Sequence, residues 1–495
     1  MSASLTNSLA ELSVKGESRF SVELSNAPIL LCEKIVRRVP NKRIVAQGVW
    51  RGKAVFAKLF FGKSAAKYLA RDKHGIDLLA QSNIATPEVL YTGLSSDGCV
   101  HVLILEAIEA SQNVEVAWLS LNVANDRLQL AKQLVAEVAK HHKSGLLQTD
   151  LYLKNFLIQD NKVFTLDGDG IRRLSCIFKE RQKLYNLATL FSKMDVLDDA
   201  WISELYAHYC SQLELPCTPL LEAEVWYLTQ KIRHKVASTY ADKKVFRTCT
   251  DVKVTQSFDL YSALATGLHQ QVFSLEVLDA TLTNKQANLK NGKTCTIAKA
   301  TLAQTDVVVK RYNIKNFWHG LNRAFRKSRA ATSWANAHRL MICGIVTPKP
   351  IALVEARFGW LRQRAYFVSE YVDAPDALRF FAQTENKWDA ALAMATLFYK
   401  LYLLKITHGD CKASNIKMVK GEPMLIDLDA MQGHATCWLA EAWFNRKHVK
   451  DLKRLMKNWV EDAEVTALLR QAFDQIYNEQ YPYEPNPILH RAGLM

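Results

Sequence analysis

A spacing of three polar residues occurs twice in this chain, and it constrains the possible folds more than any other feature. Each copy has an aspartate, an asparagine five residues later and a second aspartate twelve residues after that. The copies are Asp150, Asn155 and Asp167, and Asp410, Asn415 and Asp427. All three positions are displaced by 260 residues, and each last aspartate follows a short apolar run. Chance would have to reproduce both the order and the spacing, so the sequence predicts an internal repeat.

Other short segments repeat at a similar place in each half. The recurring residues are Ile84, Thr86 and Pro87 in the first half and Ile345, Thr347 and Pro348 in the second, at a displacement of 261. Lys58, at the end of VFAK, has a counterpart in Lys310, at the end of VVVK. The repeat therefore extends from a strand lysine to the last aspartate of each half.

The residue types in each copy are those that phosphoryl transfer from ATP to a hydroxyl requires. One carboxylate must orient the acceptor and take its proton, which is the role expected for Asp410. Magnesium needs hard oxygen ligands, which Asn415 and Asp427 can supply from a loop and a strand end. The spacing is typical of a kinase catalytic loop. A surface loop with three polar residues spaced this way by chance is the alternative.

Further positions in each half are candidates for holding ATP. Lys58 and Lys310 each lie at the end of an apolar strand, from which a lysine can reach phosphate oxygens. An edge-strand lysine is the alternative. Glu106 and Glu370 end later strands, where a kinase hinge holds adenine, although an ordinary strand-end glutamate gives the same pattern. In a kinase, a glutamate of the helix after the strand lysine pairs with that lysine. The acid at this place after Lys58 is Asp72, whose side chain is one methylene shorter.

Some features depart from the protein-kinase pattern. Neither half contains GxGxxG between its first strands, so the loop over the phosphates is glycine-poor or absent. Residues 329–340, the expected helix after Lys310, contain no acid. Gln148 stands two residues before the first aspartate, where the second half has His408.

A chain of 495 residues is too long for one ordinary core, so two domains are expected. The pattern predicts an α+β fold of two tandem protein-kinase-like domains, each with a small β-rich N-lobe and a mainly helical C-lobe. The expected domains are residues 20–255 and 265–495. The expected elements are strands in 48–61, 100–107, 271–282 and 295–300, helices over 64–81 and 125–142, and a mostly helical stretch over 177–264.

The formal net charge of +15 favours an anionic partner, such as an acidic phospholipid, an acidic glycan or nucleic acid. Residues 310–329 interleave cations with aromatic residues, which suits a membrane surface, although a solvated insertion is the alternative. No nucleic-acid-binding motif accompanies this segment, so no nucleic acid partner is expected. The sequence has no apolar run of eighteen residues and no signal-like start, so a cytoplasmic location is expected.

Both halves resemble the lipopolysaccharide kinase family of Kdo and heptose kinases. The second half does so through VVVKRYNIKNFWHGLNRAFRKSR, GIVTPKPIAL, HGDCKASN and LIDLD, and the first through IATPEVL, QTDLYLKNFLI and TLDGD. The resemblance covers nearly the whole chain, although its motifs do not fix a substrate. It implies a protein-kinase-like fold and the phosphorylation of a heptose or Kdo hydroxyl of the lipopolysaccharide inner core, with ATP and Mg²⁺ as cofactors.

The resemblance also implies residue roles, a partner and a place in the cell. The implied base is Asp410, the implied metal ligands are Asn415 and Asp427, and the implied ATP contact is Lys310; Asp150, Asn155, Asp167 and Lys58 take the same roles in the first half. Asp169 and Asp429 are either further ligands or turn caps. The implied partner is lipopolysaccharide core or another anionic glycolipid at an anionic membrane surface, on the cytoplasmic side of a Gram-negative inner membrane.

Other functions remain open at this point. One is a pseudokinase-type binding module or scaffold for lipopolysaccharide biosynthesis, because the glycine loop and a helix glutamate are missing. Another is a phosphotransferase of the aminoglycoside or choline type, which also carries HGD followed by Asn. The acceptors of those enzymes are cations held in acidic clefts, whereas this chain is basic. Phosphorylation of proteins is a third possibility.

Overall fold

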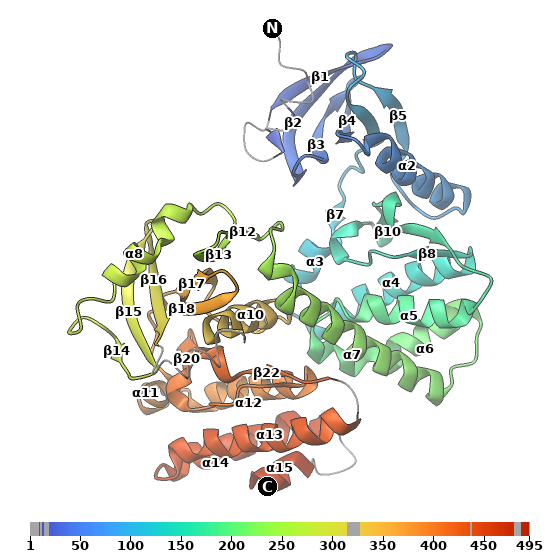
Figure 1. Ribbon diagram of the computed structural model, residues 1–495. Helices are drawn as coiled ribbons and strands as arrows, with labels where there is room; N and C mark the ends of the chain where they lie inside the picture. The colour runs from blue at the N-terminus through green and yellow to red at the C-terminus, as the bar shows by residue number, and fades with distance from the viewer. Residues whose placement is uncertain are drawn as a thin grey trace. The chain divides into compact units, whose positions relative to one another are not determined.

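The computed structural model describes residues 9, 12–13, 19–313, 327–435, 438–479 and 487–494. They form a mixed helix and sheet structure that divides into two compact units (Figure 1). The first unit comprises residues 1–194 and 198–229, and the second comprises 195–197 and 230–495. Helix α7 (Pro219–Asp242) carries the chain from the first unit into the second. The domain limits inferred from sequence, 20–255 and 265–495, stay a prediction.

The first unit begins with a six-stranded antiparallel sheet in the order β1-β2-β3-β4-β6-β5. Its strands are β1 (Phe20–Leu24), β2 (Ala27–Val39), β3 (Arg43–Trp50), β4 (Lys53–Phe60), β5 (Val89–Leu94) and β6 (His101–Glu106). Arg51 and Gly52 both have positive φ, as a two-residue hairpin turn with the right-handed strand twist requires. The stretch 48–61, expected to form strands, is therefore divided by this turn between β3 and β4. Helix α2 (Ala65–Gln81) lies beside this sheet (Figure 1).

The rest of the first unit is mainly helical. Its helices are α3 (Val114–Ser120), α4 (Ala124–Lys143), α5 (Lys179–Phe191), α6 (Ile202–Leu213) and the first part of α7. The short strands are β7 (Gln112–Asn113), β8 (Leu146–Gln148), β9 (Phe156–Gln159), β10 (Lys162–Thr165) and β11 (Ile171–Arg173). Helix α4 buries Ala131, Leu134, Val135 and Val138, which is the apolar face that its 3.6-residue period predicts.

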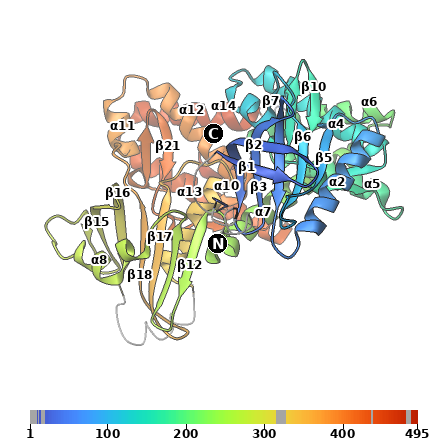
Figure 2. The same ribbon diagram turned by 90° about the horizontal axis from the view of Figure 1, so that it is seen from above.

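The second unit contains a seven-stranded antiparallel sheet in the order β12-β13-β17-β18-β16-β15-β14 (Figure 2). Its strands are β12 (Val252–Gln256), β13 (Leu260–Ala265), β14 (Lys290–Asn291), β15 (Cys295–Leu302), β16 (Thr305–Tyr312), β17 (Pro350–Phe358) and β18 (Leu361–Glu370). The expected strand over 271–282 is wrong. That stretch forms a 3₁₀ turn and helix α8 (Leu275–Ala280), because the Ser274 side chain caps the Val277 N–H and Phe273, Leu278 and Leu282 pack into the core. The expected helical stretch also ends early, since β12 and β13 occupy its last part.

The remaining helices of the second unit surround its largest core. They are α10 (Arg329–Ile342), α11 (Ala377–Gln383), α12 (Lys387–Leu403), α13 (Trp438–Met456), α14 (Ala463–Glu479) and α15 (Pro487–Ala492), with short strands β19 (Ile406–Thr407), β20 (Ile416–Val419), β21 (Glu422–Leu425) and β22 (Gln432–Gly433). Among the described residues, no helix has the length and apolar character needed to cross a bilayer. Most of the basic and aromatic segment at 310–329 lies outside the described residues.

Candidate active sites

Each asparagine of the repeat holds its loop in the same way. Asn155 donates its side-chain N–H to the Asp150 carbonyl oxygen at 2.8 Å, and Asn415 donates to the Asp410 carbonyl oxygen at 2.9 Å. The backbone carbonyls of Asn155 and Asn415 in turn accept the N–H of the residue before each last aspartate. The loop aspartate and the strand that ends in the second aspartate are thereby joined. The side-chain oxygen of each asparagine is the atom left for a cation.

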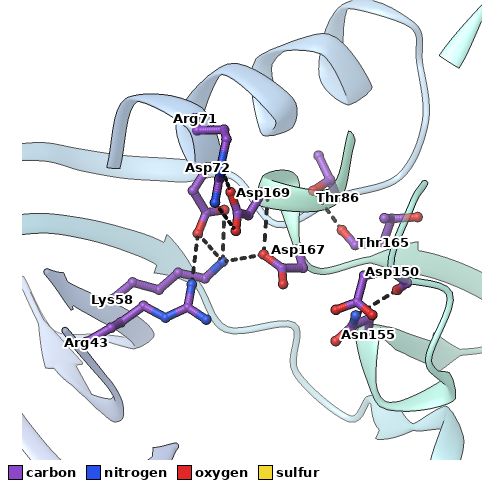
Figure 3. A network of polar contacts seen from close by, with 10 residues as sticks. All are labelled: Arg43, Lys58, Arg71, Asp72, Thr86, Asp150, Asn155, Thr165, Asp167 and Asp169. Carbon is purple, nitrogen blue, oxygen red and sulfur yellow. Dashed lines mark hydrogen bonds and ion pairs between the residues drawn. The ribbon is translucent and has the colours of Figure 1, made fainter. Parts of the chain in front are cut away.

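The recurring threonine explains why the Ile-x-Thr-Pro segment belongs to the repeat. The Thr86 hydroxyl donates to the Thr165 carbonyl oxygen at 2.9 Å, and the Thr347 hydroxyl donates to the Leu425 carbonyl oxygen at 2.8 Å. Both bonds fasten the segment before β5 or β17 to the strand that delivers the last aspartate. Thr86 therefore has a structural role next to the first site (Figure 3).

In the first unit, the strand lysine is held by an acid from the neighbouring helix (Figure 3). Lys58 on β4 donates to both carboxylate oxygens of Asp72 on α2, at 2.9 and 2.7 Å, and lies 3.5 Å from Asp167. Arg43 approaches Asp72 at 3.8 Å. The predicted pairing of Lys58 with Asp72 is thus present, although the acid is one methylene shorter than a glutamate. Burial raises the pKa of Asp72, while the Lys58 charge acts in the opposite direction.

In the second unit, the strand lysine is held by Asp427 and Asp429 instead. Lys310 on β16 donates to Asp427 at 2.5 Å and lies 3.7 Å from Asp429. At the displacement of 261, the position of Asp72 is taken by Ser333, which hydrogen-bonds the Tyr312 hydroxyl at 2.9 Å. The absence of an acid from residues 329–340 therefore redirects Lys310 toward the loop after β21.

The electrostatics of the second site follow from this cluster. Burial alone would raise the pKa of Asp427, but the positive charge of Lys310 and the hydrogen bond that Lys310 donates outweigh it and lower that pKa to about 2. Burial would lower the pKa of Lys310, yet its neighbours raise it. Because burial raises the pKa of Tyr312 to about 12, this phenol is neutral near pH 7, so Asp427 and Asp429 supply the negative charge. Lys310 and Asp427 therefore face each other as a charged pair.

Asp169 and Asp429 have the same kind of partner in both units. Arg71 of α2 binds both oxygens of Asp169, with its Nη2 at 2.8 Å, and Arg329 of α10 donates to Asp429. Neither aspartate is simply a turn cap. Each joins the loop after the last aspartate of the repeat to the helix that follows the strand lysine, a connection that the sequence motifs did not indicate.

The two last aspartates differ in backbone conformation. Asp427 lies in the left-handed region, with φ 60° and ψ 59°, whereas Asp167 is extended, with φ −112° and ψ 99°. The Asp167 side chain accepts a hydrogen bond from the N–H of Asp169. The two carboxylates are therefore presented differently despite their identical sequence spacing.

The catalytic-type loops also differ in their support. In the second unit, the buried Asp451 of α13 accepts the His408 N–H at 2.8 Å and the Gly409 N–H at 3.1 Å. Gly409 has φ +80°, and an added Cβ would lie 2.7 Å from the Ala430 carbonyl oxygen, so a side chain there is excluded. Burial raises the pKa of Asp451.

The first unit supports its loop with neutral groups. Asn186 of α5 donates to the Gln148 carbonyl oxygen at 2.8 Å, at the point where Asp451 binds the other loop. The side-chain amide of Gln148 is buried and finds no hydrogen-bond partner among the described residues. The structure shows an ion pair on the Asp410 carboxylate, from Arg454 at 2.5 Å, but none on Asp150 within the described part of the chain.

The two strand-end glutamates occupy equivalent positions. Glu106 pairs across the sheet with Val55, three residues before Lys58, and Glu370 pairs with Val307, three residues before Lys310. Both are exposed or half-exposed, and the Glu106 carboxylate lies 3.7 Å from Lys53. Neither glutamate has a contact with its strand lysine among the described residues, and the nucleotide-base role expected for both stays a prediction.

Sequence reasoning missed Asp451 and Arg454. They follow Asp410 by more than forty residues, and the first unit has no acid or cation at the corresponding places, so the repeat could not mark them. The sequence feature that links them is their separation by three residues in one helix, which places both side chains on the same helix face. Among the described residues, no group of three or more His, Cys, Asp or Glu side chains could hold a metal ion. The donor set that fits magnesium is instead one carboxylate with one amide oxygen, which leaves the other positions to water and phosphate.

A strand lysine opposite an aspartate, together with an aspartate and asparagine loop, defines a kinase site. More particularly, residues 280–477 match the model of the Lipopolysaccharide kinase (Kdo/WaaP) family. This match confirms the resemblance that the sequence motifs indicated, over most of the second unit. No curated protein matches the chain.

Many solved structures resemble part of the chain. One is "WaaP in complex with acyl carrier protein", with 17% sequence identity and a TM-score of 0.32, covering 41% of this chain and 89% of that one. Another is "Structure of vaccinia related kinase 3", with 11% identity and a TM-score of 0.24, covering 34% of this chain and 57% of that one.

Proposed function

We propose that this protein is an ATP- and Mg²⁺-dependent kinase that phosphorylates a heptose or Kdo hydroxyl of the lipopolysaccharide inner core. The observation that carries the proposal is the second site, where Lys310 lies against Asp427 and Asn415 holds the Asp410 loop, so that the residue types that phosphoryl transfer needs occur together. The family match over residues 280–477 supports the acceptor class. The proposal includes two tandem kinase-like domains, because the two units repeat the same loop contacts.

The roles follow from the chemistry of each side chain. Asp410 accepts the proton of the acceptor hydroxyl, and Lys310 leaves Asp427 to bind phosphate oxygens of ATP. Asn415 and Asp427 would hold Mg²⁺, which neutralises phosphate charge when it is bound. Glu370 stands near the nucleotide base. In the first unit, Asp150, Asn155, Asp167, Lys58 and Glu106 are the corresponding candidates.

A second candidate function applies to the first unit alone, as a module that binds nucleotide without transferring phosphate. Lys58 and Asp72 form a complete lysine and acid pair, which favours nucleotide binding. Asp150 lacks the support that Asp451 and Arg454 give to the other loop. A bound nucleotide that is never consumed is the expected behaviour of such a site.

We also propose that the protein works at the cytoplasmic face of a Gram-negative inner membrane as a peripheral protein. The net charge of +15 favours an anionic membrane and an anionic glycolipid acceptor. No nucleic acid partner is included in the proposal.

The test is phosphate transfer from labelled ATP to deep-rough lipopolysaccharide, followed by mass spectrometry of the core. Wild-type protein should add one phosphate mass to the core, and Asp410→Asn should not. Asp150→Asn distinguishes the two candidate roles of the first unit, a kinase domain and a module that binds nucleotide without transferring phosphate. Asp126→Asn, an exposed aspartate of α4 outside both sites, is the matched control. Transfer that survives both Asp410→Asn and Asp150→Asn would refute the proposal.

A further inference from the structure

The carboxylate of Asp410 is already engaged by cations. Arg454 Nη2 lies 2.5 Å from Asp410 Oδ1, Lys412 Nζ lies 3.7 Å from the same oxygen, and Asn415 Nδ2 lies 3.3 Å from Oδ2. A guanidinium that occupies a carboxylate oxygen keeps an acceptor hydroxyl from forming its hydrogen bond to that oxygen. The arrangement therefore opposes the role proposed for Asp410 as long as Arg454 stays on it.

Arg454 reaches Asp410 from helix α13 with its side chain partly exposed to solvent. It lies three residues after Asp451 on α13, so the helix that fixes the His408 and Gly409 backbone also presents the guanidinium. The Arg454 side chain is 37% exposed and the Lys412 side chain is 49% exposed. Both cations thus border solvent beside the atom that must meet the acceptor hydroxyl.

The first unit lacks this arrangement. Asn186 is an α5 residue that contacts the first loop, through the Gln148 carbonyl oxygen, and three residues further on is Thr189, whose hydroxyl donates to the Tyr185 carbonyl oxygen. Thr189 carries no charge, so it supplies no ion pair to Asp150. The feature is therefore specific to the second unit and does not follow from the kinase-like loop itself.

We propose that Arg454 selects acceptors that carry a carboxylate or phosphate next to the hydroxyl to be phosphorylated. This inference rests on the proposed function. The acceptor anion competes with Asp410 for the Arg454 guanidinium. Arg454 then binds that anion through charge-assisted, bidentate hydrogen bonds. A neutral acceptor leaves Arg454 on Asp410, and the base stays engaged.

The transfer step balances without any further reactant. The acceptor oxygen forms a bond to the γ-phosphorus of ATP as its proton passes to Asp410 Oδ1, and the bond between that phosphorus and the bridging oxygen breaks to release ADP. Arg454 takes no part in bond making. It is a positioning and specificity residue that couples the acceptor charge to release of the base.

The test compares three acceptors: the intact core oligosaccharide, the same molecule after methyl esterification of its carboxylates, and the same molecule after enzymatic dephosphorylation. Wild-type protein should prefer the intact acceptor, and the arm whose modification lowers kcat/KM identifies the anion that Arg454 binds. Arg454→Gln should lower kcat/KM on the intact acceptor roughly 10- to 100-fold, the range for a lost charge-assisted hydrogen bond, and abolish the preference. Its KM for ATP should not change, and Arg454→Lys should restore part of the preference.

Arg446→Gln, on the same helix and exposed, removes the same charge and is the control. An equal preference in wild type and Arg454→Gln, or a wild type that does not distinguish the three acceptors, overturns the inference while leaving the proposed function intact. No transfer by wild type to any of them overturns the proposed function itself. A urea unfolding curve for Arg454→Gln that matches wild type separates lost selectivity from lost structure.

Discussion

The buried carboxylate of Asp451 gives the most direct test of how the second loop is held. It accepts the backbone N–H groups of His408 and Gly409 in a place where water cannot replace it. Asp451→Ala leaves both N–H groups without an acceptor. Since each unsatisfied buried group costs about 1–3 kcal/mol, the free energy of unfolding should fall by about 2–6 kcal/mol. Asp451→Asn retains one acceptor oxygen, so its loss should be about half of that.

Both variants should also transfer phosphate more slowly, because the loop that carries Asp410 loses its anchor. A displacement of about 1 Å is enough to reduce a rate by about 100-fold. The assays are urea unfolding followed by circular dichroism and initial rates of transfer. Glu461→Ala, which removes an exposed acid of the same unit, is the control. Wild-type unfolding and wild-type rates for Asp451→Ala would show that these hydrogen bonds do not position the loop.

Three further predictions concern the lysine sites. Lys58→Met should lower the free energy of unfolding by about 3–5 kcal/mol, because the buried Asp72 carboxylate loses its ion-pair partner. A Lys58→Met, Asp72→Leu double variant should recover most of that loss in urea unfolding. Gly75→Ala should weaken nucleotide binding to the first unit in equilibrium dialysis, since its Cβ would lie 1.9 Å from the Gly168 carbonyl oxygen and would force α2 away from the Asp167 loop; unchanged binding would contradict this. The pKa of Asp427 is lowered from 3.8 to about 2, so its ionised form stabilises the fold above that range and this contribution is lost as the pH falls through it. Asp427→Asn should therefore lose less stability than wild type between pH 4 and pH 2 in acid titrations, and equal losses would show that the lowered pKa is not linked to folding.

The repeated contacts are the part of the site that the sequence predicts best. Asn155 and Asn415 bind equivalent carbonyls, and Thr86 and Thr347 do the same, because the same hydrogen bond in both units requires the same residue type at the same spacing. The pairing of Lys58 with an acid of α2 was predictable for the same reason, since one strand and one helix set its geometry.

The differences between the units could not be predicted from the repeat. Ser333 in place of Asp72 shows that Lys310 lacks a helix partner, but the partner it takes depends on how the loop after β21 folds. Asp451 and Arg454 act from a helix far along the chain, so only tertiary packing brings them to Asp410. The wrong strand over 271–282 has a local cause, because three apolar residues at mixed spacing fit a strand and a capped helix about equally well.

The left-handed backbone at Asp427 affects how this position should be probed. Side chains other than glycine, asparagine and aspartate adopt that conformation with difficulty, so the residue type is restricted by the peptide geometry as well as by cation binding. An alanine there would add torsional strain to the loss of an oxygen donor, and an inactive protein would not reveal which of the two was responsible. Asparagine keeps the shape while removing the charge, whereas at the extended Asp167 neither replacement adds torsional strain.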